Sequence, residues 1–218
     1  MMNKHFVHVC SAAMLAGVLS TGLLAGKDKD KNKENDKAEV KDSGGQMDPA
    51  KMAEMMKKAE EAGAPGDAHK KLEPLIGEWT AEVQCWMDPG SPPMVSKGAA
   101  KAEWVMKGRF VKEEFDGEMM GKPFQGMSLT GYDNQKKHYS TLWVDDTSTA
   151  LFMSAGTADK GGRVITFESK MDCPVTGEKD MPVKQVLHIV SPDKHVFEMH
   201  HTRQGKEAKV MEITYTRK

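Results

Sequence analysis

The feature that most constrains this chain is a long succession of short segments, beginning at Gly77, in which apolar and polar residues alternate. A period of two puts successive side chains on opposite faces, which is typical of β-strands with one buried face. In the first segment Trp79, Ala81, Val83 and Cys85 share one face. The later segments are 97–106, 109–116, 123–132, 137–145, 149–155, 163–169, 182–190, 194–202 and 208–217. Turn signals rich in Gly, Pro, Asn and Asp separate them, so we predict about ten strands with short connections.

Such a run of antiparallel hairpins has to protect its two edge strands. An up-and-down β-barrel removes both edges, whereas a two-sheet sandwich is the alternative. Arg217 shares a face with Ile213 and Tyr215 on the last segment, so we expect it to point inward, where a charge needs a partner. Trp79 becomes that partner if the last strand returns beside the first. The prediction is therefore an all-β, up-and-down antiparallel β-barrel of about ten strands.

The combination of Gly77, Trp79 and Arg217 resembles the lipocalin and fatty-acid-binding (calycin) barrels. The resemblance implies that Arg217 lies across Trp79 in a cation–π contact and closes one end of the barrel. In this interpretation all three residues are structural.

Three longer stretches resemble the bacterial domain-of-unknown-function 1579 family. They are Trp-Met-Asp-Pro-Gly-Ser-Pro-Pro at 86–93, Gly-Tyr-Asp-Asn at 131–134 and Met-Glu-Ile-Thr-Tyr-Thr-Arg-Lys at 211–218. The similarity extends from Ala68 to the C-terminus. That family is regarded as calycin-like and has no assigned activity, so the resemblance implies the barrel and no catalytic residue.

The segments that precede the barrel differ in composition from it. Residues 1–26 have the charge and apolar pattern of a signal peptide, with an uncleaved membrane anchor as the alternative. Residues 27–46 are almost entirely polar and charged, so we expect a disordered spacer. Residues 47–65 are expected to form an amphipathic, Met-rich helix, and 66–218 the calycin-like barrel domain. The expected location is secreted or periplasmic, with no membrane span after cleavage of the signal.

The Met-rich helix has a clear start. Asp48 is an N-cap residue and Pro49 fits the first helical position, after which Met52, Met55 and Met56 recur at helical spacing. Such a stripe most often packs on the adjoining domain. A surface for a protein partner and a thioether copper(I) site are the alternatives.

Two cysteines remain after removal of the signal peptide, Cys85 and Cys173. An oxidising compartment permits a disulfide between them, and two unrelated thiols are the alternative. Cys-x-x-Cys spacing does not occur, which argues against zinc ribbons and thioredoxin-like chemistry.

Charge and motifs argue against several classes of function. A net charge of −1 gives no electrostatic signal for nucleic acid. The sequence contains no Gly-x-Ser-x-Gly. The neighbours Glu113-Glu114, like Asp145-Asp146, point to opposite faces of a strand and would not share a proton. His200 and His201 point to opposite faces for the same reason, so no metal site is predicted and we expect a protein without catalytic residues.

The barrel interior is therefore the expected site of function. We predict non-catalytic binding of a small apolar molecule, with contacts from Trp104, Trp143, Phe197 and Tyr215. An interior filled by its own side chains is the alternative. By analogy with calycin-type barrels that hold haem through one inward histidine, His201 is the best-placed haem ligand, and an enzyme could use the same cavity. No other cofactor is expected.

Overall fold

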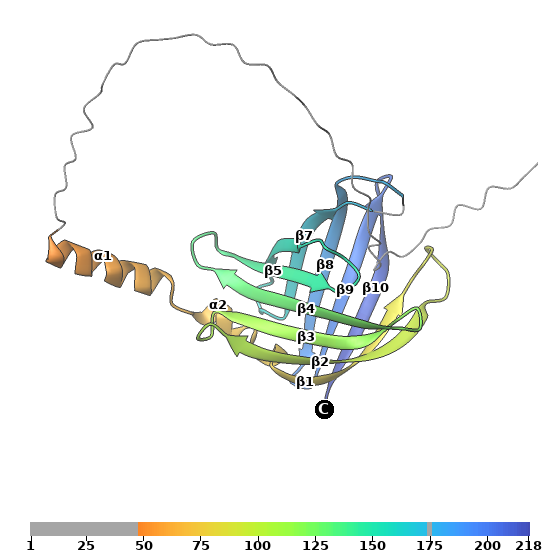
Figure 1. Cartoon of the computed structure of the whole chain (residues 1–218), viewed down its shortest axis with the longest axis horizontal. Coiled ribbons are helices and arrows are strands. Elements are labelled where there is room, and N and C mark those ends of the chain that lie inside the picture. The colour runs from red at the N-terminus through yellow and green to blue at the C-terminus, as the bar shows by residue number, and fades with distance from the viewer. Residues whose placement is uncertain (1–47, 174–175) are drawn as a thin grey trace, which may run out of the picture. The chain divides into compact units, whose positions relative to one another are not determined.

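The computed structural model of this protein describes residues 48–173 and 176–218. Ten strands of the described residues form a closed antiparallel barrel in the order β1-β10-β9-β8-β7-β6-β5-β4-β3-β2 (Figure 1). The strands are β1 (Gly77–Cys85), β2 (Met94–Val105), β3 (Phe110–Met119), β4 (Lys122–Asp133), β5 (His138–Asp145), β6 (Phe152–Ala158), β7 (Val164–Met171), β8 (Met181–Ser191), β9 (Lys194–Arg203) and β10 (Lys206–Arg217). The predicted fold class is confirmed. The predicted signal peptide and spacer lie outside the described residues.

Local turn chemistry explains why the strands pair with their neighbours in sequence. Met120-Gly121 and Gln204-Gly205 join their strands through two residues of positive φ, as the twist of a tight hairpin requires. The β2–β3 connection also begins with a positive φ, at Met106, whose side chain is 69% exposed. The strand therefore ends at Val105, one residue before the end of the predicted segment 97–106.

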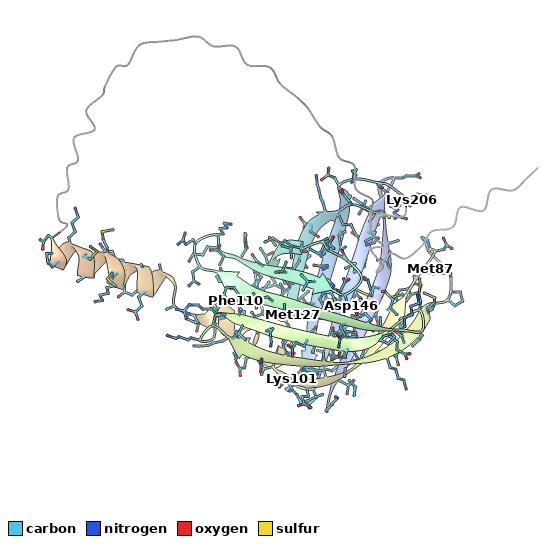
Figure 2. All side chains as sticks on the ribbon, in the orientation of Figure 1. Met87, Lys101, Phe110, Met127, Asp146 and Lys206 are labelled. Carbon is cyan, nitrogen blue, oxygen red and sulfur yellow. The ribbon has the colours of Figure 1, made fainter. Side chains whose placement is uncertain are left out.

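Alternation along each strand divides inner from outer side chains. On β1 the buried Trp79 and Ala81 alternate with exposed Glu78 and Thr80. Figure 2 shows the side chains on the whole barrel, and Lys101, which it labels, is one of the exposed residues of β2.

One end of the barrel is closed by a short segment that precedes β1. It comprises α2 (Asp67–Lys70) and the 3₁₀ turn η1 (Glu73–Leu75). Leu72 and Leu75 from this segment pack with Val111, Ile165 and other buried side chains into a core cluster. This cluster fills the barrel at the end where β1 begins and β10 ends.

Arg217 completes the closure. It pairs in register with Trp79, and its guanidinium carbon lies 4.2 Å from the centre of the Trp79 ring. The guanidinium donates hydrogen bonds to Ile76 O (2.8 Å) and Pro192 O (2.7 Å). Gly77 has a φ of +135°, and a Cβ there would lie 2.2 Å from Arg217 Nη1. Arg217 and Trp79 thus have the cation–π contact that the calycin resemblance implied, and Gly77 is needed for close approach as well as for its backbone conformation.

The helix α1 (Pro49–Ala62) is described by itself and lies within the predicted range 47–65. Asp48 Oδ1 accepts a hydrogen bond from Ala50 N at 3.0 Å, as an N-cap does. None of its residues is buried, and Met52, Met55 and Met56 are all exposed. Among the described residues, no helix is long and apolar enough to cross a membrane.

Candidate functional site

The barrel contains a cavity of about 460 Å³. Its floor includes Leu75, and its wall reaches Met94, Met119 and Met171, which lie at strand ends opposite Arg217. The cavity therefore lies between the closed end and the far end of the barrel. Six of the described methionines line it, at positions 94, 119, 120, 171, 199 and 211. Because methionine is flexible and polarisable, this lining can adapt to the shape of an apolar ligand.

Three of the four residues predicted as ligand contacts line this cavity. They are Trp143, Phe197 and Tyr215. Trp104 lies outside the described lining: it packs against the closed-end core, and its indole N–H donates to Glu73 Oε2 at 2.6 Å. Whether any of these side chains contacts a ligand stays a prediction.

The side chain of Trp143 is held in place from two sides. Its Nε1 donates to Asp145 Oδ2 at 2.9 Å. The opposite carboxylate oxygen, Oδ1, accepts from the N–H of Thr147 at 2.9 Å and from its hydroxyl at 2.6 Å. A Cβ at Gly126 would lie 2.3 Å from the Trp143 ring, so only glycine allows the ring to lie over β4. The indole is therefore a fixed part of the wall.

Aromatic rings connect the closed end to the cavity. The ring of His195 packs edge-on against Trp79, with centroids 4.4 Å apart, and stacks on Tyr215, with centroids 4.2 Å apart. The Tyr215 hydroxyl donates to Glu113 Oε1 at 3.3 Å. We call Arg217, Trp79, His195, Tyr215 and Glu113 the closure column. The column begins with Arg217 at the closed end of the barrel and ends with the carboxyl group of Glu113 on the cavity wall.

Glu113 is the residue that the sequence interpretation missed. It lies on β3 between the buried Val111 and Phe115, lines the cavity, and points away from the exposed Glu114. Burial raises the pKa of Glu113 to about 7, although the hydrogen bond from Tyr215 opposes that rise. The alternation of Val111, Glu113 and Phe115 was a signal for an inward carboxyl, whereas the sequence interpretation treated Glu113 only as half of a pair with Glu114.

Three buried side chains of the cavity wall have a polar atom without a hydrogen-bond partner among the described residues. The atoms are Gln185 Oε1, His195 Nδ1 and His201 Nε2, and the residues are only 4%, 3% and 7% exposed. Burial, followed by the charge of Arg217, lowers the pKa of His195 to about 3. Burial, followed by the charges of Arg203 and His200, lowers the pKa of His201 to about 4. Both imidazoles are therefore neutral at pH 7. Because an unpaired buried polar atom is costly, these atoms are available to a ligand in the cavity.

The two cysteines lie in different surroundings. Cys85 lines the cavity on β1. Cys173 is buried with Met171, Met181 and Val183, and its sulfur accepts a hydrogen bond from Arg203 Nη2 at 3.4 Å. A bridge between them stays a prediction.

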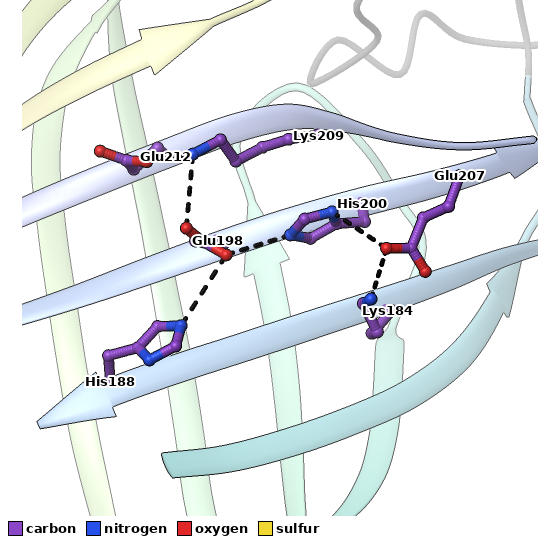
Figure 3. Close-up of polar contacts among 7 residues, drawn as sticks. All are labelled: Lys184, His188, Glu198, His200, Glu207, Lys209 and Glu212. Carbon is purple, nitrogen blue, oxygen red and sulfur yellow. Dashed lines mark hydrogen bonds and ion pairs between the residues drawn. The ribbon is translucent and has the colours of Figure 1, made fainter. Parts of the chain in front are cut away.

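The outer face of β8, β9 and β10 carries a contrasting network of charged side chains (Figure 3). Glu198 Oε2 accepts from His200 Nε2 at 3.1 Å, and Glu198 Oε1 lies 3.3 Å from Lys209 Nζ. His200 Nδ1 lies 3.4 Å from Glu207 Oε1, which also pairs with Lys184. Within the part of the chain that the structure describes, no group of three or more His, Cys, Asp or Glu residues is arranged to hold a metal ion. These contacts pair each charge with its neighbours on the barrel surface.

Comparison with known proteins identifies a family and a fold. Residues 64–217 match the family model described as "Protein of unknown function (DUF1579)". No curated protein matches the chain. Among solved structures, the crystal structure of Rv2717c from M. tuberculosis is 14% identical, covers 71% of this chain and 99% of its own, and has a TM-score of 0.51. At this identity the likeness concerns the fold alone.

Two further structures have lower TM-scores. A redesigned β-barrel is 17% identical, covers 69% of this chain and 95% of its own, and has a TM-score of 0.34. The S-type phycobiliprotein lyase CPES from Guillardia theta is 10% identical, covers 71% and 98%, and has a TM-score of 0.45.

Proposed function

The chain belongs to the DUF1579 family, whose function is unknown, and we propose that its barrel binds a small, largely apolar molecule without catalysing a reaction on it. The observation that carries this proposal is a mostly apolar cavity with a few buried polar atoms that have no partner among the described residues. A cavity of a few hundred Å³ with a few convergent polar groups is typical of small-molecule sites. Trp143 and Phe197 supply aromatic surface, which the Asp145 hydrogen bond fixes at Trp143, and the methionines supply adaptable surface.

A neutral fluorescent probe tests this proposal directly. We expect N-phenyl-1-naphthylamine to bind the purified protein, and Met199→Trp to weaken that binding at least about tenfold because the indole occupies the space of the ligand. Met153 lies on β6 and is 67% exposed, so Met153→Trp is the matched control and should change affinity less than about twofold. Thermal melting of both variants establishes that they are folded. Equal binding by both variants, or no probe binding at all, contradicts the proposal.

Native mass spectrometry of protein purified gently from its host addresses the natural ligand. Extra mass that disappears on denaturation supports a carrier. A clean mass of the polypeptide alone, together with no probe binding, favours an interior that serves only to hold the fold together.

Haem binding is the second candidate function, because His201 Nε2 is a buried, neutral nitrogen on the cavity wall with no partner among the described residues. Haem iron takes such a histidine as an axial ligand, and bound haem would supply its redox and gas-binding chemistry. This chain's part would be to donate Nε2 and to exclude water with the apolar wall. Titration with hemin should give a Soret band that His201→Ala removes and His200→Ala retains. An unchanged hemin spectrum in wild-type protein excludes this candidate.

We also propose that the protein acts outside the cytoplasm, in the periplasm or after secretion, on the basis of the signal-like residues 1–26. Amino-terminal sequencing of the protein from its host tests this, because an intact first residue contradicts cleavage. A partner surface on the Met-rich helix α1 stays a prediction.

A further inference from the structure

The described wall of the cavity carries several carboxyl groups but no positively charged side chain of Lys or Arg. Its wall carries the carboxyl groups of Glu113, Glu118 and Asp145, whereas none of its described lining residues is Lys or Arg. The guanidinium of Arg217 is not part of that lining and is engaged by backbone carbonyls at the closed end. A ligand carboxylate in the cavity would therefore face three carboxyl groups and no cation.

The carboxyl of Glu113 has capacity for further hydrogen bonds. Its one hydrogen bond among the described residues is long, 3.3 Å from the Tyr215 hydroxyl, and a carboxylate offers about four acceptor positions. Asp145 differs, because Trp143 and Thr147 already give it three hydrogen bonds of 2.6–2.9 Å. Glu113 is thus the acidic group of the wall whose hydrogen-bonding is least satisfied.

Gln185 provides a second, independent acceptor. Its Oε1 is buried on β8, lines the same cavity, and has no partner among the described residues. By contrast, the hydroxyls of Thr130 and Thr141 bond each other at 2.8 Å, so part of the hydroxyl donor capacity is already used. The unfilled demand of Glu113 and Gln185 is for hydrogen-bond donors.

We propose that the apolar ligand carries a donor group, a primary ammonium or a hydroxyl, that binds the carboxyl of Glu113, with Gln185 Oε1 as a further acceptor in the same cavity, and that the cavity discriminates against carboxylates. This inference rests on the proposed function and specifies the class of its ligand. An ammonium group gives the Glu113 carboxylate the opposite charge that it lacks inside the barrel, and a hydroxyl gives it a neutral donor. A ligand carboxylate loses its hydration, meets these carboxyl groups, and finds no Lys or Arg among the described lining residues.

The test compares three ligands with the same ten-carbon tail, decylamine, 1-decanol and decanoate, each below its aggregation concentration. Each competes with N-phenyl-1-naphthylamine for the wild-type protein. Decylamine and decanol should displace the probe at least about tenfold more effectively than decanoate. Decanoate that competes as well as decylamine overturns the inference, because the tail and the probe are held constant.

A pair of neighbouring variants then assigns the preference to one side chain. Glu113→Gln keeps the size of the side chain and should weaken decylamine about tenfold while changing decanol less than about threefold. Glu114→Gln is the matched control, because Glu114 lies on the outer face and bonds Lys112. An unchanged amine preference in Glu113→Gln overturns the assignment. Failure of the probe itself to bind wild-type protein would instead contradict the proposed function, so the two failures are distinguishable.

Discussion

The two faces of the strands β8, β9 and β10 handle polar side chains in opposite ways. His200 and His201 are adjacent, yet His200 lies on the outer face between Glu198 and Glu207 (Figure 3), whereas His201 points inward with Nε2 unpartnered among the described residues. The outer charges pair with one another and need nothing more. The inner groups are buried without partners, at a cost that a ligand can offset. Hydrogen-bond satisfaction therefore distinguishes the charged outer face from the inner face that we assign to binding.

Removal of the Arg217 side chain, which closes the barrel on the inner side of this comparison, should have the largest effect on the unfolding free energy. Arg217→Ala deletes the guanidinium hydrogen bonds and the contact with Trp79, and we expect a loss of about 4 kcal/mol of unfolding free energy. Chemical denaturation measures it. The exposed Lys206 lies at the other end of β10, and Lys206→Ala should cost less than about 0.5 kcal/mol. Equal midpoints for the two variants would show that the closure column does not hold the barrel together.

The two adjacent histidines should differ in their effect on acid stability. The pKa of His201 is near 6.5 in the unfolded chain and about 4 in the folded protein. Between these values the unfolded chain binds the proton more readily, so the protein keeps its full unfolding free energy above pH 6.5 and loses part of it as the pH falls from 6.5 to 4. We expect His201→Leu to remove about 3 kcal/mol of that acid-dependent loss. His200→Leu should keep it, since His201 remains. Denaturation midpoints at pH 7, 5.5 and 4 distinguish the two, and parallel pH curves for wild type and His201→Leu would contradict the buried position of His201.

Glu113 and Glu114 provide the corresponding comparison for acids. The carboxyl of Glu113 titrates near 4.5 when unfolded and about 7 when folded, so the folded state loses stability as the pH rises from 4.5 to 7. Glu113→Gln should raise the unfolding free energy by about 3 kcal/mol at pH 8 and change it little at pH 4.5. Glu114→Gln should shift it by less than about 0.5 kcal/mol at either pH. Stabilisation of similar size at both pH values would mean that ionisation of Glu113 is not the cause.

The outer network should give the smallest effect. Lys184→Ala breaks a half-exposed pair with Glu207, so we expect a loss below about 1 kcal/mol that shrinks further in 0.5 M salt. A larger, salt-independent loss would show that the outer face also depends on specific polar contacts.

The sequence was sufficient for the barrel because its signals are local. Period-two alternation and turn residues predicted each strand and its connection to the next. The pair Trp79–Arg217 indicated that the last strand lies beside the first. The position of a side chain along the barrel axis was not predictable in the same way. Trp104 belongs to a correctly predicted strand, but the stagger between strands places it at the closed end with Glu73, outside the cavity lining.

The polar character of the cavity was harder to predict than its walls. His201 was expected to face inward from alternation alone, but the Tyr215–Glu113 contact joins residues 102 positions apart, and no local pattern reports it. Gln185 Oε1 lacks a partner because none of the described side chains around it in the folded barrel donates a hydrogen bond to it. The sequence alone does not show which side chains those are.

The pairing of β1 with β10 has a consequence for how the chain folds. Every other strand pair in the barrel joins consecutive strands, whereas the hydrogen bond from Arg217 to Ile76 O spans 141 positions. Closing so long a loop is entropically expensive and slow, so we expect the hairpins to assemble first into an open, curved sheet with two bare edges. That intermediate is the species most prone to aggregate, and docking of Arg217 beneath Trp79 ends its lifetime.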